Sequence, residues 1–428
     1  MSRLPVVVIG AGPQGLAAAA HLLERGLEPL VLEAGPGPAS AVAEWAHVRL
    51  FSDWSELVDS SARRLLEPTG WVMPAAGYPT GGEWVSFYLA PLAVALGERV
   101  RYGARVSRVS RPDEAEPFKV DLLGVETPIE ARAVIDASGT WARPNPAGAN
   151  GLAAAGEDAA SDFLANRIPS PADADQFAGK HTVVVGSGHS ATTAINELAR
   201  IAATHDNTRI TWVLRRGDAE SAFGGGEADE LPARGALGLT ARRSVESGAV
   251  TLVTGFRVES LATGSSGVVL TSEDQRRLPE ADHVLVLTGF RPDLSFLSGL
   301  RLDLDSRLEA PVRIAAEIDP EFHSCGTVKA TGARDLAHPE KDFYLVGAKS
   351  YGRAPTFLAM TGYEQVRSVA AELAGDHEAA ARIDLVLPAT GVCGGTGVAE
   401  VASEGGGSCC SPADIPLQVV RGGVHRFF

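Results

Sequence analysis

Cysteine is scarce in this sequence of 428 residues. Only four cysteines occur, none of them lies before Cys325, and no two are spaced as C-x-x-C. A secreted scaffold held together by disulfides is excluded, because such scaffolds are short and rich in cysteine. A redox disulfide of the C-x-x-C type is excluded as well. Any role for sulfur therefore lies in the last quarter of the chain.

Basic residues and long apolar runs are also scarce. The chain has 38 Lys and Arg against 53 Asp and Glu, a formal net charge of -15 and a pI near 5.2. Phosphate-rich partners usually need a basic surface, so we expect neither a nucleic acid nor a membrane as partner. No run of 18 apolar residues is present, and a strand follows Met1–Arg3 directly, without a signal peptide. The sequence therefore predicts a soluble cytoplasmic protein.

A glycine-rich turn follows the first apolar strand of the chain. Its sequence is GAGPQG at residues 10–15, and an alanine-rich helix comes next. In a dinucleotide-binding turn, Gly10 would allow the tight bend, Gly12 the approach of a pyrophosphate, and Gly15 close packing of helix and strand. The following strand ends at Glu33, whose carboxylate can accept hydrogen bonds from both ribose hydroxyls. We name residues 10–15 the first glycine turn and predict that they bind a dinucleotide.

Additional strands are expected before the first site is completed. Short alternating segments between residues 100 and 134, beginning with Val100, predict a small antiparallel meander. The next strand ends in DASGT at residues 136–140. The small residues Ser138 and Gly139 would let the chain pass close to the first cofactor.

A second glycine turn is present at residues 186–191, with the sequence GSGHSA. The strand after it ends in Arg215 and Arg216 and not in an acid. A ribose 2′-phosphate is a dianion that guanidinium groups bind bidentately, whereas a carboxylate would repel it. The arginines therefore favour NADPH over NADH, although a solvated strand end would have the same sequence.

The remaining motifs indicate a return to the first site. LTGFRP at residues 287–292 ends a buried strand, and YLVGAKSYGR at residues 344–353 precedes a helix predicted from about Leu358 to Leu373. The N-terminus of that helix would suit the electron-rich end of a flavin. Trp54 belongs to an aromatic segment that could lie against a flat ring or pack in the core, and the sequence leaves both open.

In this order, the motifs resemble those of flavoproteins with two dinucleotide-binding domains, particularly the flavin-dependent monooxygenase group, up to about residue 388. The resemblance implies an α/β fold with two Rossmann-like domains, the second inserted in the first, and a flexible C-terminal tail. The implied divisions are residues 1–150 (FAD-binding domain, first part), 151–290 (NADPH-binding domain), 291–385 (FAD-binding domain, return segment) and 386–428 (tail).

The resemblance also implies FAD and NADPH as cofactors. The residues predicted to bind FAD are Gly10, Gly12, Pro13, Gln14, Gly15, Glu33, Trp54, Ser138, Gly139, Gly347 and Thr356. Those predicted to bind NADPH are Gly186, Gly188, Ser190, Arg215 and Arg216.

A narrower resemblance involves the sequences at residues 323–328, 350–357 and 388–393. They look like bacterial flavoproteins that accompany arsenic-resistance genes, some of which oxidise trivalent arsenicals. Thiolates bind soft ions such as As(III) and Sb(III), and the chain carries an adjacent pair in a glycine- and serine-rich segment. The candidate metalloid-binding residues are Cys325, Cys393, Cys409 and Cys410. The alternative is that these four cysteines have no function.

These observations lead to one hypothesis and two alternatives. The hypothesis is an FAD-dependent, NADPH-consuming monooxygenase that uses dioxygen, through a peroxyflavin, to oxidise arsenite, methylarsenite or antimonite to the pentavalent form. No Ser-His-Asp, Cys-His or metal-ligand spacing is present, so we assign no catalytic side chain and no structural metal. The alternatives are an N- or S-oxygenase of a small organic substrate and a non-catalytic flavin-containing metalloid-binding protein.

Overall fold

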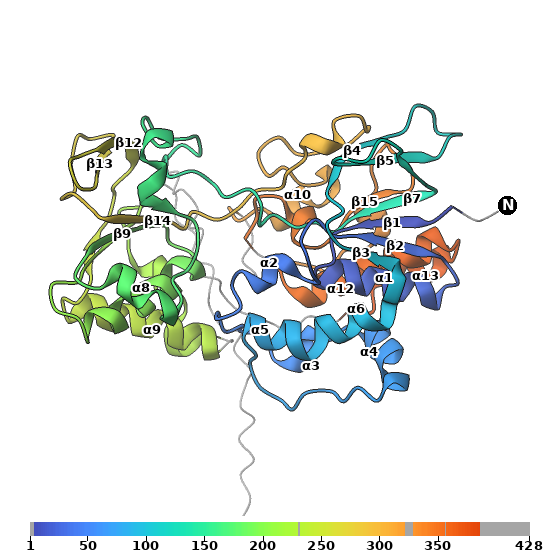
Figure 1. Ribbon diagram of the computed structural model, residues 1–428, viewed down its shortest axis with the longest axis horizontal. Coiled ribbons are helices and arrows are strands. Elements are labelled where there is room, and N and C mark those ends of the chain that lie inside the picture. Colours follow the sequence, from blue (N-terminus) through green and yellow to red (C-terminus); the bar gives the residue numbers. More distant parts are fainter. Residues whose placement is uncertain (1–3, 230–231, 322–327, 356, 386–428) are drawn as a thin grey trace, which may run out of the picture. The chain divides into compact units, whose positions relative to one another are not determined.

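The computed structural model describes residues 4–229, 232–321, 328–355 and 357–385 (Figure 1). Two parallel β-sheets carry the fold, and both lie within one compact unit of the chain. The first sheet has the strand order β15-β7-β1-β2-β3. Its strands are β1 (Val6–Ile9), β2 (Pro29–Leu32), β3 (Val100–Arg101), β7 (Ala133–Asp136) and β15 (Phe343–Leu345). Because β15 comes after the second sheet in sequence and pairs with β7, the chain leaves the first sheet and returns to it.

Strand β1 is buried on both faces, as its uninterrupted apolar sequence predicts. Val6 and Val8 pack in the core formed with the helices α1 (Pro13–Glu24) and α12 (Ala359–Leu373). Val7 and Ile9 face the opposite core, which a three-stranded antiparallel sheet covers. That sheet consists of β4 (Val106–Ser110), β5 (Phe118–Leu122) and β6 (Ile129–Ala131).

The meander prediction was wrong at its beginning. Val100 and Arg101 form β3, which pairs in parallel with β2, with Val31 opposite Val100. This segment is therefore the edge of the first sheet and not part of the antiparallel one. A strand of two residues has no alternation that could indicate its partner, so the sequence could not decide between the two sheets.

The second sheet is also parallel and has the order β11-β10-β9-β14-β8. Its strands are β8 (Leu164–Ala165), β9 (His181–Val185), β10 (Arg209–Val213), β11 (Thr251–Val253) and β14 (His283–Val286). The helices α8 (His189–Ala202) and α9 (Pro232–Glu246) accompany it, together with the hairpin β12 (Val258–Thr263) and β13 (Val268–Ser272). The predicted fold class, with the second parallel sheet inserted in the first, is confirmed, while the tail lies outside the described residues.

Shorter helices complete the described chain. They are α2 (Ser40–Ala43), α3 (Trp54–Leu57), α4 (Ser60–Leu66), α5 (Gly81–Trp84), α6 (Ala90–Leu96), α7 (Ala174–Phe177), α10 (Val312–Ile318), α11 (Ala333–Leu336) and α13 (His377–Ala381). A π-helical turn, η2 (Val85–Leu89), joins α5 to α6. Among the helices of the described ranges, none has the length and apolar character needed to cross a bilayer.

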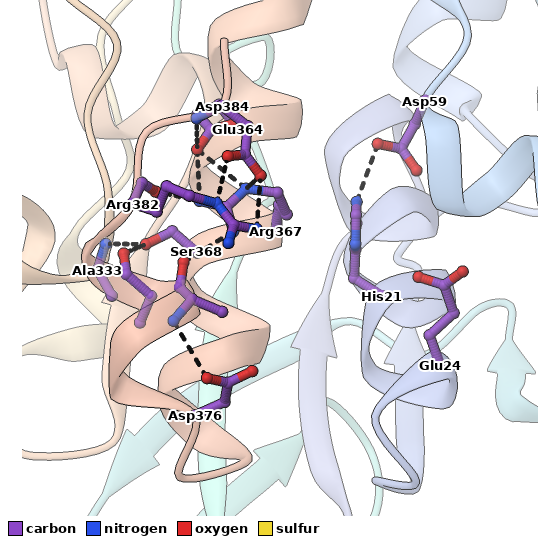
Figure 2. Close-up of polar contacts among 12 residues, drawn as sticks. His21, Glu24, Asp59, Ala333, Glu364, Arg367, Ser368, Asp376, Arg382 and Asp384 are labelled. Carbon is purple, nitrogen blue, oxygen red and sulfur yellow. Dashed lines mark hydrogen bonds and ion pairs between the residues drawn. The ribbon is translucent and has the colours of Figure 1, made fainter.

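Polar contacts hold the helices of the first sheet together (Figure 2). On one side, His21 of α1 lies 2.9 Å from the carboxylate of Asp59, which caps α4. On the other, Arg367 of α12 donates to Glu364 of the same helix at 2.6 Å and to the carbonyl oxygen of Ala379 in α13 at 2.9 Å, and its Nε lies 3.5 Å from Asp384. His21 and Asp59 are buried and satisfy each other, which is the normal requirement for buried polar groups, whereas Asp384 is exposed.

A fully buried ion pair lies at the end of the first sheet. Lys349 Nζ lies 2.6 Å from Asp136 Oδ2, and both side chains are inaccessible to solvent. The same ammonium group donates to Ser138 Oγ at 2.9 Å and lies 4.4 Å from the ring centroid of Phe296. Asp136 ends β7, where the chain leaves the sheet, and Phe296 belongs to η8 (Ser295–Leu297), where it returns. The pair therefore joins the outgoing segment, the return segment and η9 (Gly347–Tyr351).

Aromatic side chains connect the two segments that run between the sheets. Trp141, on the outgoing segment, stacks on Phe290, on the return segment, with ring centroids 4.7 Å apart. The guanidinium carbon of Arg167 lies 4.0 Å from the centroid of Trp141. The outgoing segment and the return segment are thus in direct contact.

The buried ion pair gives a prediction for stability. Lys349→Met removes the ammonium group and leaves the Asp136 carboxylate buried without a counter-charge, which should lower the free energy of unfolding by about 3–5 kcal/mol. Urea unfolding followed by circular dichroism measures this change. Lys341→Met is the control, because its ammonium group pairs with Glu114 at the surface, where solvent screens the charges. Wild-type stability of Lys349→Met would contradict the importance of the pair.

Candidate dinucleotide-binding sites

Of the three glycines in the first glycine turn, Gly12 is the one with space for a side chain. Gly10 has a φ of +98°, and a Cβ there would lie 2.9 Å from the carbonyl oxygen of Ala137. A Cβ on Gly15 would lie 1.9 Å from the carbonyl oxygen of Gly10, so no side chain fits at either position. A Cβ on Gly12, in contrast, would meet nothing within 4 Å. The protein thus packs tightly behind the turn and is open in front of Gly12.

The charges around this opening favour a phosphate and a ribose. Gly12 is the N-cap of α1, and no side chain caps the helix, so its N-terminal amides and partial positive charge face the opening. Glu33 comes directly after β2, and its two oxygens accept hydrogen bonds from the backbone N–H groups of Ala11 at 2.7 Å and Gly35 at 2.8 Å. These bonds fix the carboxylate at the edge of the turn.

The start of α12 approaches the same turn. The buried side chain of Gln14 lies against two glycines: a Cβ on Gly347 would lie 2.7 Å from its Cγ, and a Cβ on Gly362 2.4 Å from its Nε2. Gln14 Nε2 donates to the carbonyl oxygen of Ala359 at 3.1 Å. Its Oε1 is buried and has no hydrogen-bond partner among the described residues. A ligand that donates a hydrogen bond at this point would satisfy it. The opening at Gly12, the uncapped start of α1, Glu33 and this free oxygen of Gln14 together fit FAD.

The other residues predicted for the first site lie in different surroundings. Ser138 donates to Asp136 Oδ1 at 2.6 Å, next to Gly10, and Gly139 has a φ of +68° with open space around it. Trp54 is 7% exposed and packs in the apolar core beside α1 and α12, the alternative that its sequence left open. Thr356 lies outside the described residues.

The second glycine turn repeats the geometry of the first. Gly186 has a φ of +141°, and a Cβ there would lie 2.3 Å from the carbonyl oxygen of Leu287. Gly188 is the N-cap of α8 without a side-chain cap, and a Cβ on it would meet nothing within 4 Å. Trp212, which no sequence motif indicated, is fully buried and donates from Nε1 to the carbonyl oxygen of Gly186 at 2.8 Å. Ser190 lies in the first turn of α8.

Arginine side chains gather beyond the end of β10. Arg215 donates to the carbonyl oxygen of Ala149 at 3.0 Å. Desolvation and the charges of Arg216, Arg257 and Arg353 lower the pKa of Arg215. Within the described ranges, no carboxylate oxygen lies within 4.0 Å of the guanidinium nitrogens of Arg215 or Arg216. This excess of positive charge at the edge of the second site fits an anionic group such as the 2′-phosphate of NADPH.

The predicted metalloid ligands have no described surroundings. Cys325, Cys393, Cys409 and Cys410 all lie outside the described residues. Among the residues that are described, no cluster of three or more His, Cys, Asp or Glu side chains could hold a metal ion.

Two parallel sheets, each followed by a glycine turn that opens onto an uncapped helix, are typical of proteins with two dinucleotide-binding domains. The family model for pyridine nucleotide-disulphide oxidoreductases matches residues 7–312, and the chain belongs to this family. The family assignment supports a flavin oxidoreductase that depends on NAD(P)H, with FAD and NADPH as its cofactors.

The chain is similar in sequence to one plant monooxygenase and in fold to several solved structures. The chain is 32% identical over 196 residues to indole-3-pyruvate monooxygenase YUCCA1 of Oryza sativa subsp. japonica, a match that spans 45% of each chain. Its fold is similar to bacillithiol disulfide reductase Bdr from Bacillus cereus, with a TM-score of 0.66, 20% identity and coverage of 87% and 99% of the two chains. It is also similar to a flavin monooxygenase from Stenotrophomonas maltophilia, with a TM-score of 0.58, 23% identity and coverage of 88% and 99%.

The two open glycines give a paired prediction. A methyl group at Gly12 or Gly188 strains neither backbone and touches no protein atom, but it occupies the space that a pyrophosphate needs. Gly12→Ala should therefore keep wild-type thermal stability without cofactor and weaken FAD binding at least about tenfold in a flavin fluorescence titration. Gly188→Ala should retain FAD and raise the KM for NADPH.

Each of the two variants serves as the control for the other. Unchanged FAD affinity of Gly12→Ala, or an NADPH defect equal in both variants, would contradict the separate assignment of the two turns.

Proposed function

We propose that this chain is an FAD-dependent, NADPH-consuming monooxygenase whose substrate is a trivalent metalloid such as arsenite, methylarsenite or antimonite. One observation carries the choice of oxygenase: residues 1–324, which contain both glycine turns, have no cysteine. A reductase of the thioredoxin reductase type uses a redox pair of thiols in C-x-x-C spacing, and the sequence offers none. We therefore propose dioxygen as the acceptor of the electrons.

The side chains act in this proposal by binding and orientation. The opening at Gly12, the α1 N-terminus and Glu33 hold FAD, while Arg215 and Arg216 bind the 2′-phosphate of NADPH. Bound FAD supplies the chemistry that carries electrons from NADPH to dioxygen. The protein contributes position and the exclusion of water, so no acidic or basic side chain has to be assigned.

The electron balance fits a substrate with a lone pair. NADPH gives two electrons as hydride, and the lone pair of the trivalent metalloid gives two more. Together they reduce dioxygen, of which one oxygen atom binds the metalloid and the other becomes water with the transferred hydrogen and one proton. The product is the pentavalent metalloid.

Sulfur chemistry supports the metalloid as substrate. Thiolates prefer soft ions, and Cys409 and Cys410 form an adjacent pair that two-point binding of As(III) or Sb(III) can use. The sequences around Cys325 and Cys393 carry the resemblance to flavoproteins associated with arsenic resistance. We propose these four residues as the ones that capture the substrate.

A second candidate is an oxygenase of a small organic molecule. It is favoured by the 32% identity to a relative whose name gives indole-3-pyruvate as substrate. In that case the cysteines have no role in catalysis.

The arginine assignment gives a prediction for cofactor preference. Replacing Arg215 and Arg216 by Ala removes two charged donors to the 2′-phosphate, so the ratio of kcat/KM for NADPH over NADH should fall at least about tenfold. Arg242→Ala is the control, because this side chain pairs with Glu220 on the surface of the same domain. If the double variant keeps the wild-type ratio, other residues recognise the phosphate.

The substrate is tested by measuring NADPH oxidation with and without arsenite, methylarsenite or antimonite. At least one of them should accelerate the oxidation, with one pentavalent product formed for each NADPH consumed. Replacing Cys409 and Cys410 by Ser should raise the KM of that metalloid about tenfold with little change in kcat. Flavin reduction by NADPH without any acceleration by metalloids, but with acceleration by indole-3-pyruvate, would favour the organic substrate.

A further inference from the structure

A cavity of about 270 Å³ lies among the helices that cover one face of the first sheet. Residues of α1, α3, α4 and α12 line it, together with Leu385 at the end of the described chain. Water occupies about 30 Å³ per molecule in the liquid, so the cavity has room for a molecule of roughly five to nine heavy atoms. None of its lining residues is among those predicted to bind FAD or NADPH. We name it the α1–α12 cavity.

The lining of the α1–α12 cavity is acidic. Carboxylates outnumber basic groups, and an anionic ligand would meet this surplus of negative charge, whereas a cation would be attracted by it. The carboxylates belong to Glu56, Asp59, Glu364 and Asp384, and the basic groups to Arg367 and His21.

Glu364 of α12 brings a buried carboxylate with one free oxygen into this cavity. Its side chain is 6% exposed. Oε1 accepts hydrogen bonds from Arg367 at 2.6 Å and 3.0 Å, and from the backbone N–H of Asp384 at 3.2 Å. Oε2 has no hydrogen-bond partner among the described residues, and it is not sealed from solvent. Since a buried carboxylate oxygen without a donor is unfavourable, a ligand that donates to Oε2 would be stabilised.

His21 of α1 offers a second acceptor, across from Glu364 (Figure 2). Its Nε2 lies 2.9 Å from Asp59 Oδ2, and Oδ1 of the same carboxylate accepts from the backbone N–H of Ala62 at 2.8 Å. When Nε2 carries the ring proton and donates it to Asp59, Nδ1 is an acceptor. No donor contacts Nδ1 in the described part of the chain. Two walls of the cavity therefore present acceptors that have no donor.

We propose that the α1–α12 cavity binds a small aliphatic amine in its protonated form. An ammonium group carries a positive charge and three donors, which match the free acceptors of Glu364 and His21. The carbon chain of such a ligand can contact the apolar side chains of Val58, Met360 and Leu385, which also line the cavity. A bare metal ion fits less well, because no cluster of three or more His, Cys, Asp or Glu side chains within the described ranges could hold one.

Isothermal titration calorimetry of the FAD-loaded full chain with putrescine tests the proposal. Putrescine should bind at least about tenfold more tightly than 1,4-butanediol, its neutral analogue, and succinate should not bind. Glu364→Gln removes the charge of the carboxylate whose oxygen is free and should weaken putrescine binding at least about tenfold. Glu98→Gln is the matched control, because Glu98 is exposed outside the cavity. FAD content and thermal unfolding verify that both variants fold.

Glu56→Gln gives a second measurement that leaves the contact between Glu364 and Arg367 intact. Its amide oxygen can still accept the hydrogen bond that Glu56 Oε2 accepts from the backbone N–H of Asp53 at 3.2 Å. The variant removes one negative charge from the lining, so the dissociation constant for putrescine should rise about threefold.

Putrescine binding that Glu364→Gln and Glu56→Gln weaken and Glu98→Gln leaves unchanged supports the proposal. Equal affinity for putrescine and 1,4-butanediol overturns it, as does wild-type affinity in both cavity variants, which would place the amine at another site. Absence of binding to the wild type overturns it as well. If putrescine then binds to Arg421→Gln with Arg426→Gln, the cavity belongs to a guanidinium group of the same chain and not to a free amine.

Discussion

The buried pair of Asp136 and Lys349 is the constraint on which the first site depends. Neither charge has access to water, so either charge alone would strongly destabilise the fold without its partner. Through Ser138 the pair fixes residues 136–139, and this segment forms the wall against which Gly10 packs. The shape of the first glycine turn is therefore determined partly by a lysine more than 300 residues further along the chain.

The two sites share one plan and differ in the charge at the end of the next strand. In each turn the first glycine has no space for a side chain, the second faces an open volume, and the helix behind it lacks a side-chain cap. The strand after the first turn ends in a carboxylate that accepts two backbone hydrogen bonds. Beyond the end of β10, Arg215 and Arg216 carry two guanidinium groups without a carboxylate within 4.0 Å among the described residues. The two otherwise similar glycine turns thus differ in the sign of the charge that follows the next strand.

The sequence was most informative where a function depends on neighbouring residues in the chain. Local patterns predicted both glycine turns, the helix α12 and the insertion of the second sheet in the first. Each of these motifs carries its own geometric requirement. The partners of Gln14, the burial of Lys349 and the bond from Trp212 to Gly186 could not be predicted, because they join segments far apart in sequence. A lysine is normally expected at the surface, and a burial of this kind leaves no pattern in the sequence.

The stack of Trp141 on Phe290 has a mechanical consequence. Two independent linkers would let one domain bend and twist relative to the other in many directions. Because the rings are in contact and Arg167 lies over one of them, the outgoing and return segments are joined directly to each other. Separating the rings would cost about 0.5–1.5 kcal/mol. The stack thus resists any motion that moves the outgoing and return segments apart.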